Sequence, residues 1–142
     1  MRASSLIFSL ALLLAPTVGH AQTVHIPANE HWHWLQPERW LRAAHSTQTF
    51  TRTKDGDTLH LAAQQVERDA RATYHLLRGR LVAITFHFAE DYSYQANWIY
   101  QGAEFLGGHE WLDRRTNAHI TARREGNAGV SYEVRYVPPT AD

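Results

Sequence analysis

Apolar and polar residues alternate along much of the second half of the chain. Residues 74–88 read YHLLRGRLVAITFHF, and residues 118–122 and 130–136 alternate in the same way. Successive side chains of a strand point to opposite faces, so this pattern predicts half-buried strands. A three-residue connection at 78–80 would keep the apolar side chains of 74–88 on one face. The predicted inward set is Tyr74, Leu76, Val82, Ile84, Phe86, Phe88, Ala118, Ile120, Ala122, Val130, Tyr132, Val134 and Tyr136.

Two shorter segments extend this set of strands. The pair Asp55-Gly56 predicts a tight hairpin turn between strands that contain Phe50 and Leu61, because such a pair supplies the positive φ angles that the turn requires. A short strand is expected around Trp111. Residues 62–72 fit a helix in part, but both neighbouring segments are strands, so strand and irregular chain are favoured there.

Two segments have helical spacing. Residues 37–45 begin with Pro37, which a first helical turn tolerates. A second helix is expected to begin near Asp91 or Ser93 and to end at Gly107-Gly108. Its apolar stripe would consist of Trp98, Ile99, Gly102, Ala103, Phe105 and Leu106, with Gly102 allowing a close approach to the sheet. The predicted fold class is therefore α+β, a mainly antiparallel sheet with two helices packed on one face.

The opposite parity of the same strands predicts a surface that we call the polar face. Its members are Thr51, Thr53, Thr58, His60, His75, Thr85, His87, His119, Thr121, Arg123, Ser131, Glu133 and Arg135. Antiparallel sheets commonly have one solvated face, and that is the simplest interpretation. The alternative is a binding surface rich in hydrogen-bonding groups.

Residues 1–21 resemble a secretory signal peptide. Arg2 precedes the apolar run LIFSLALLL, and Gly19 and Ala21 are small residues at the expected cleavage site. The chain contains no cysteine, so neither a disulfide nor a lipid anchor on cysteine can form. We therefore expect a soluble periplasmic protein that begins at Gln22, with one domain over residues 22–142 and a frayed tail over 138–142.

The charge balance argues against two classes of partner. Removing Arg2 from the 14 basic residues leaves 13, against 14 acidic residues. Such a chain offers no basic surface for nucleic acid or anionic lipid, so neither nucleic-acid binding nor membrane insertion is expected.

Candidate chemistry is sparse. In EHWHW, residues 30–34, an extended backbone would put His31 and His33 on one side, where two imidazoles could bind a divalent metal. Two ligands without a third make a weak site, so no metal or other cofactor is expected. His109, Glu110 and Asp113 could form an acid–base cluster, but an ordinary polar loop is the favoured explanation. No catalytic motif is present, which favours a protein that is not an enzyme.

The run YHLLRGRLVAITFHF, the segment FLGG, the strand at Trp111 and the ending VSYEVRYV together resemble the helix-plus-meander modules of β-lactamase-inhibitory proteins and outer-membrane assembly lipoproteins. The resemblance covers about residues 74–137 and implies binding to another protein. The missing lipidation cysteine argues against the lipoprotein role. Small exported domains without cysteine also resemble immunity proteins, which neutralise antibacterial toxins in the periplasm.

The leading hypothesis is thus an immunity protein that blocks a secreted effector by binding it. The residues expected to contact the partner are His60, His87, His119, Arg114, Arg115, Arg123 and Arg135. The alternative is a periplasmic protein that binds a metal or small ligand through its surface histidines.

Overall fold

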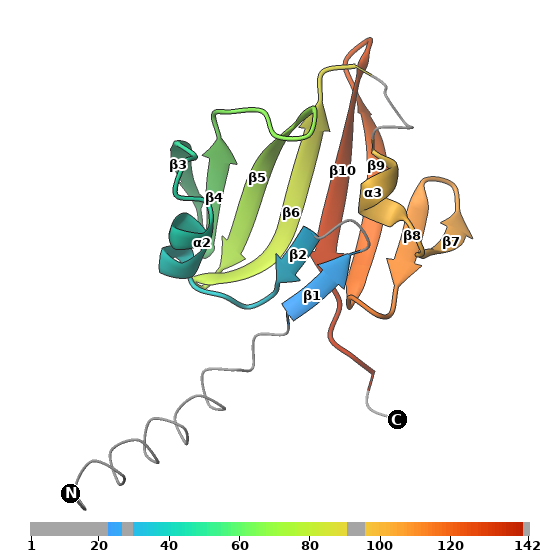
Figure 1. Ribbon diagram of the computed structural model, residues 1–142, viewed down its shortest axis with the longest axis horizontal. Coiled ribbons are helices and arrows are strands. Elements are labelled where there is room, and N and C mark those ends of the chain that lie inside the picture. The colour runs from blue at the N-terminus through green and yellow to red at the C-terminus, as the bar shows by residue number, and fades with distance from the viewer. Residues whose placement is uncertain (1–22, 27–29, 91–95, 141–142) are drawn as a thin grey trace, which may run out of the picture.

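A computed structural model of the chain describes residues 23–26, 30–90 and 96–140, and its main feature is an eight-stranded antiparallel sheet (Figure 1). The strands lie in the order β3-β4-β5-β6-β10-β9-β8-β7. Two four-stranded meanders are thus joined where β6 pairs with β10. The bounds are β3 Phe50–Asp55, β4 Thr58–Ala63, β5 Ala70–Leu77, β6 Arg80–Phe88, β7 Glu104–Gly107, β8 Glu110–Asp113, β9 Ala118–Glu125 and β10 Gly129–Tyr136.

One face of this sheet is covered and forms the core. The hairpin of β1 (Thr23–Ile26) and β2 (Glu30–His33) crosses it, with α2 (Glu38–Ala44) on one side and α3 (Asn97–Tyr100) on the other (Figure 1). The antiparallel sheet is confirmed, but the two helices have only seven and four residues, so the fold is mainly β. No helix in the described ranges is long and apolar enough to span a membrane.

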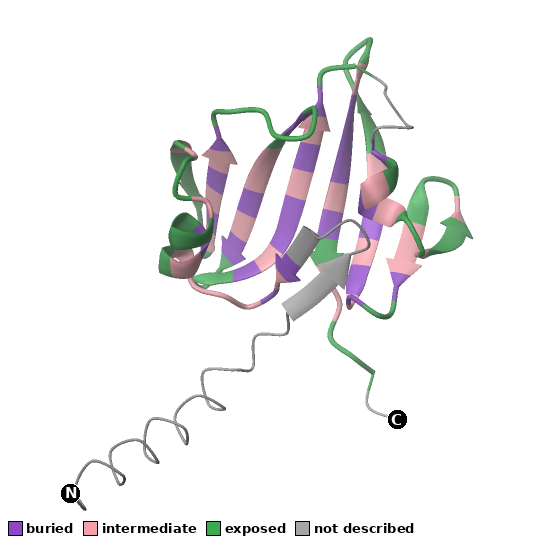
Figure 2. Cartoon of the chain, viewed as in Figure 1, coloured by how far each residue is buried: buried purple, intermediate pink, exposed green. Residues whose placement is uncertain are grey.

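The predicted alternation is confirmed in the central strands, where buried and half-buried residues follow one another (Figure 2). The hairpin of β3 and β4 is also confirmed, but its turn is Gly56-Asp57 rather than Asp55-Gly56, and Gly56, with a φ of 57°, is its one residue with a positive φ. Residues 62–72 form the end of β4, a turn and the start of β5, as favoured. The fully buried large side chains are Trp32, Trp34, Leu41, Leu61, Leu76, Leu81, Phe88, Ile99, Ile120 and Val134.

The second helix is much shorter than predicted. Its expected start at residues 91–95 lies outside the described residues, and α3 ends at Tyr100. At Gly102 the backbone has a φ of 80°, which is incompatible with a helix, and the chain then enters β7. Phe105 and Leu106 are consequently 61% and 48% exposed rather than buried in a helical stripe. Pairing of β7 with β8 has overridden the local periodicity.

The turn between β5 and β6 also differs from the prediction. It has two residues, Arg78 and Gly79, both with positive φ, instead of three. Leu76 pairs with Leu81 while His75 pairs with Ala83, so Val82 is an extra, bulged residue. Leu81 therefore takes the core position predicted for Val82, and the bulge restores the parity of Ile84, Phe86 and Phe88.

Candidate functional site

The polar face exists as a continuous surface on the uncovered side of the sheet. The register places His60, His75, Ala83, Arg135 and His119 in one row across five neighbouring strands. The next row contains Thr73, Thr85, Glu133 and Thr121. In the part of the chain that the structure describes, no helix or strand lies over these rows (Figure 1).

Two histidines of the polar face form a close pair. Nδ1 of His60 and Nδ1 of His75 are 2.7 Å apart, and Nε2 of His75 is 2.7 Å from the hydroxyl of Thr85. One imidazole must donate and the other accept, so the pair is compatible with two neutral rings. Burial, and then the proximity of His60, lower the pKa of His75 from 6.5 to about 4.

The other histidines of the polar face lie beside carboxylates. His87 contacts Glu125 at 3.0 Å through Nδ1 and the hydroxyl of Thr73 at 3.2 Å through Nε2. Nε2 of His119 lies 3.6 Å from a carboxylate oxygen of Glu110. These contacts orient the imidazole rings of His87 and His119. Both rings therefore already have a carboxylate of the same chain as a neighbour.

The predicted arginines divide into two groups. Arg135 donates to Glu133 at 3.0 Å, so its guanidinium is already bound on the polar face. Arg123 is exposed and, among the described residues, has no ion pair or hydrogen-bond partner for its side chain. Sequence reasoning missed a second arginine of this kind, Arg71 on β5. The register aligns Arg71, His87, Ser131 and Arg123 in one row. The sequence could have indicated Arg71, because it lies four residues before His75 on the same strand and so faces the same side.

Arg114 and Arg115 are separate from this row, in the turn after β8. Arg115 donates to the buried carboxylate of Asp113 through Nη2 at 2.8 Å and Nε at 3.1 Å, which raises the pKa of Arg115. Asp113 pairs with Ala118, whose side chain faces the core, so this ion pair belongs to the covered side. Arg114 is exposed and lies 3.8 Å from Glu104. The structure thus does not gather these two arginines with Arg123.

Of the two histidines in EHWHW, the structure describes the side chain of His33. His33 is half-buried with its ring 4.1 Å from the ring of Trp40, centroid to centroid. The side chain of His31 lies outside what the structure describes. No group of three or more His, Cys, Asp or Glu residues in the described ranges is arranged to hold a metal ion.

The possible acid–base cluster does not assemble either. Glu110 pairs with Thr121, on the polar face, whereas Asp113 pairs with Ala118, on the covered face. His109 is exposed in the turn before β8. The three groups therefore do not converge on one point.

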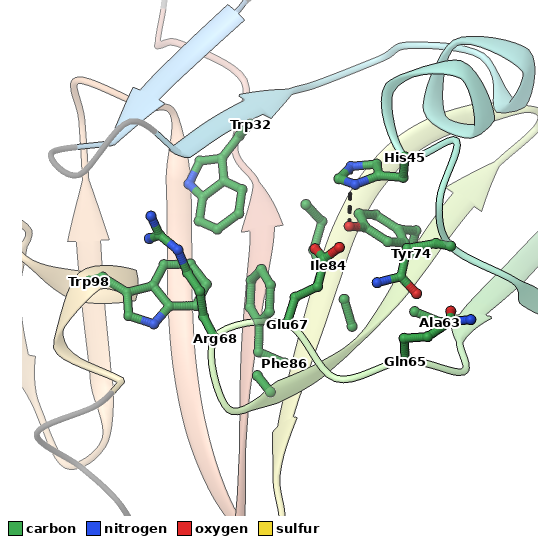
Figure 3. A pocket seen from close by; sticks show the side chains of 13 residues that line it. Trp32, His45, Ala63, Gln65, Glu67, Arg68, Tyr74, Ile84, Phe86 and Trp98 are labelled. Carbon is green, nitrogen blue, oxygen red and sulfur yellow. Dashed lines mark hydrogen bonds between the residues drawn. The ribbon is translucent and has the colours of Figure 1, made fainter.

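The covered face contains a cavity of about 370 Å³, which sequence reasoning did not identify (Figure 3). Ile84 and Phe86 of the sheet form its floor, and Trp32 of β2 and Trp98 of α3 form a wall. The turn between β4 and β5, residues 64–69, contributes Gln65, Glu67 and Arg68. The segment that follows α2 contributes His45 and Gln48. His45 contacts the hydroxyl of Tyr74 at 3.3 Å.

The sequence contained one signal for this cavity, the two tryptophans of EHWHW. Alternation predicts that Trp32 and Trp34 lie on one side and anchor the N-terminal segment to the core, and both are at least 98% buried. Which of the two would line a cavity depends on segments far away in the chain.

Comparison of the chain with protein-family models, curated proteins and solved structures finds no match.

Proposed function

We propose that this protein is exported and binds another protein through its polar face, as an immunity protein that neutralises a toxin acting in the periplasm. The observation that carries the proposal is the uncovered polar side of an eight-stranded sheet, on which Arg71 and Arg123 have no ion-pair partner among the described residues. Neutralisation of this kind needs a stable scaffold and a complementary surface, and no chemistry of its own.

The dimensions of the polar face suit a protein partner. At about 3.3 Å per residue and about 4.8 Å between strands, the eight strands together cover roughly 800 Å². A stable protein complex of standard size buries about 800 Å² on each partner. A small ligand would use only a fraction of this surface, so its extent favours a macromolecule.

The charges of the polar face favour a partner with acidic groups. Arg135, His87 and His119 are already beside carboxylates of the chain. Arg71 and Arg123 have no such neighbour among the described residues, and they flank His87 and the buried Ser131 in the same row. Two guanidinium groups on a rigid sheet can each bind a carboxylate in a bidentate manner.

The test requires a candidate toxin, which we would seek among secreted effectors encoded by neighbouring genes. It compares the binding of two doubly charge-reversed variants to that toxin. Arg71→Glu/Arg123→Glu changes the polar face. Arg39→Glu/Arg78→Glu makes the same change in net charge at two exposed positions, on α2 and in the turn between β5 and β6. We expect the first variant to weaken the complex by roughly 100-fold or more and to abolish neutralisation of the toxin, because buried interfacial charge pairs contribute several kcal/mol.

The control variant should change affinity by roughly threefold or less, since charges outside an interface act mainly through screened long-range steering. Calorimetry gives both affinities, and circular dichroism checks that both variants fold. Equal weakening by the two variants would show that net charge, not the polar face, governs binding. Undiminished binding by the Arg71→Glu/Arg123→Glu variant would exclude the polar face as the interface.

A further inference from the structure

The cavity on the covered face contains buried polar atoms that the protein itself does not satisfy. The ring of Trp32 is only 2% exposed, and its Nε1 has no hydrogen-bond partner among the described residues. The same is true of Oε1 of Gln48, and both residues line the cavity. Buried donors and acceptors in folded proteins almost always have a hydrogen-bond partner. One donor and one acceptor without partners at the same cavity therefore indicate that a bound molecule supplies them.

A cation lies beside the unpaired indole. The guanidinium of Arg68 stacks over the ring of Trp98, 5.4 Å from its centroid, and the rings of Trp98 and Trp32 are 6.4 Å apart. In Figure 3 this guanidinium lies between the two tryptophans. A guanidinium has five N–H donors in a fixed fork, so Arg68 can bind an anion while it keeps its contact with Trp98.

The backbone that presents Arg68 is strained. Arg68 and Asp69 have φ values of 50° and 66°, and the turn is closed by two hydrogen bonds between Glu67 and Ala70, of 2.8 and 3.0 Å. Two-residue turns with positive φ at both positions are usually formed by Asn-Gly or Asp-Gly. Arginine in this conformation costs backbone strain, as Arg78 also does in the turn between β5 and β6.

We propose that this cavity binds a small organic monocarboxylate with an apolar, ring-sized body. The carboxylate accepts hydrogen bonds from Nε1 of Trp32 and from Arg68, and the body lies on Phe86 and Ile84. A hydroxyl or amino group on the body would satisfy Oε1 of Gln48. The volume of about 370 Å³ lies at the lower end of small-molecule sites.

Glu67, the residue before Arg68 in the turn, limits the charge of the ligand. Glu67 lines the cavity, and Figure 3 shows its carboxylate directed toward the middle of the opening, near Tyr74. A second negative charge on the ligand would face this carboxylate. A ligand with one carboxylate, placed at the Trp32 side, avoids that repulsion.

The experiment follows the indole N–H signals of the five tryptophans of the isotope-labelled protein by NMR. The variants Trp32→Phe and Trp34→Phe each lose one signal, which identifies the signals of Trp32 and Trp34. The probes are 3-phenylpropionate, 3-phenylpropan-1-ol and 3-phenylpropylamine, which share one body and differ in the polar end. We expect 3-phenylpropionate to move the Trp32 signal downfield in a saturable manner and to bind roughly tenfold or more tightly than the other two probes.

The matched variants are Arg68→Asn and Arg78→Asn. Both residues have positive φ in two-residue turns, at 50° and 49°, and asparagine tolerates this conformation, so both variants should keep the fold. Arg68→Asn should weaken 3-phenylpropionate binding by roughly tenfold, because it removes a charge-assisted hydrogen bond. Arg78→Asn, which lies outside the cavity, should leave the affinity unchanged.

Three results would overturn the proposal. Equal binding of the three probes would mean an apolar pocket without selection for a carboxylate. Absence of a saturable shift of the Trp32 signal at probe concentrations on the order of 10 mM would mean that no such site exists. Unchanged affinity of Arg68→Asn for 3-phenylpropionate would mean that the guanidinium of Arg68 does not bind the carboxylate. The Arg71→Glu/Arg123→Glu variant should bind 3-phenylpropionate normally, which separates this site from the polar face.

Discussion

The indole rings of Trp32 and Trp34 lie 6.3 Å apart, centroid to centroid, yet only one of them has a hydrogen-bond partner among the described residues. Nε1 of Trp34 donates to the backbone carbonyl of Thr116 at 2.9 Å. Nε1 of Trp32 is also buried but has no acceptor among the described residues, and Trp32 lines the cavity. Two residues with the same identity and nearly the same burial therefore have different energetic roles.

Replacing each tryptophan by phenylalanine should separate these roles. Trp34→Phe removes a buried hydrogen bond and leaves the carbonyl of Thr116 without its donor, whereas Trp32→Phe removes a donor that has no partner. Both variants lose similar ring volume. We expect Trp34→Phe to lower the free energy of unfolding by about 1–2 kcal/mol more than Trp32→Phe, measured by urea denaturation. Equal losses would mean that the bond to Thr116 contributes nothing.

The stability of the protein should fall at acidic pH because of His75. Its pKa is lowered from 6.5 to about 4 by burial and then by His60, with smaller effects of Glu133, Arg135 and His87. Between these two pH values the unfolded chain binds a proton that the folded protein does not. The contribution of His75 to the free energy of unfolding is thus fully present above pH 6.5 and is lost as the pH falls toward 4.

The predicted loss is about 1–2 kcal/mol, less than the full shift implies, because the side chain of His75 remains partly solvated. His75→Gln should flatten the dependence of the urea midpoint on pH over this window. His60→Gln should flatten it only in part, since it removes the neighbouring histidine but leaves the burial. A midpoint for His75→Gln that varies with pH as strongly as in the unmodified protein would contradict this assignment.

Gly102 should tolerate alanine less well than Gly126. Both have positive φ, 80° and 63°, so alanine at either position costs about 1 kcal/mol of backbone strain. A Cβ at Gly102 would lie 2.7 Å from Nη2 of Arg115, which is bound to Asp113, whereas a Cβ at Gly126 would meet nothing within 4 Å. We expect Gly102→Ala to cost about 1 kcal/mol more, measured by thermal or urea unfolding. A similar cost at both positions would show that Arg115 moves aside freely.

The adjacent residues Arg114 and Arg115 should differ sharply when each is replaced by methionine. Arg115→Met leaves the carboxylate of Asp113, which is 5% exposed, without its charged partner, so we expect a loss of about 1–3 kcal/mol. Arg114→Met removes only a long, exposed ion pair with Glu104, and a loss below about 0.5 kcal/mol is expected. Similar urea midpoints for the two variants would argue against a structural role for Arg115.

Much of the sheet can be predicted from alternation alone. The inward positions of β9 and β10, such as Ile120 and Val134, follow from a period of two, and Gly56 identifies the turn of the first hairpin. The polar face follows from the same pattern, because a residue's parity within a strand determines its face. These features are local, since each depends on a few neighbouring residues.

Other features depend on how one strand pairs with the next, which the pattern within a single segment does not show. The pairing of β7 with β8 ends the helix at Tyr100 and exposes Phe105, although the local spacing is helical. The bulge at Val82 shifts Leu81 into the core, because the side chains of β5 and β6 must match across the turn. Neither outcome has a signal within the segment itself.

The candidate sites show the same division. Parity places Arg123 and Arg135 on the polar face, together with Glu133, which lies two residues before Arg135 on the same strand and binds its guanidinium. Trp32 and Trp34 share one pattern, and only the approach of Thr116, 82 residues away from Trp34, distinguishes them. The alternation of side chains thus specifies which face each residue occupies. Contacts between distant segments determine which polar groups on that face are left for a partner, because hydrogen bonds and ion pairs require positioning within a few tenths of an ångström.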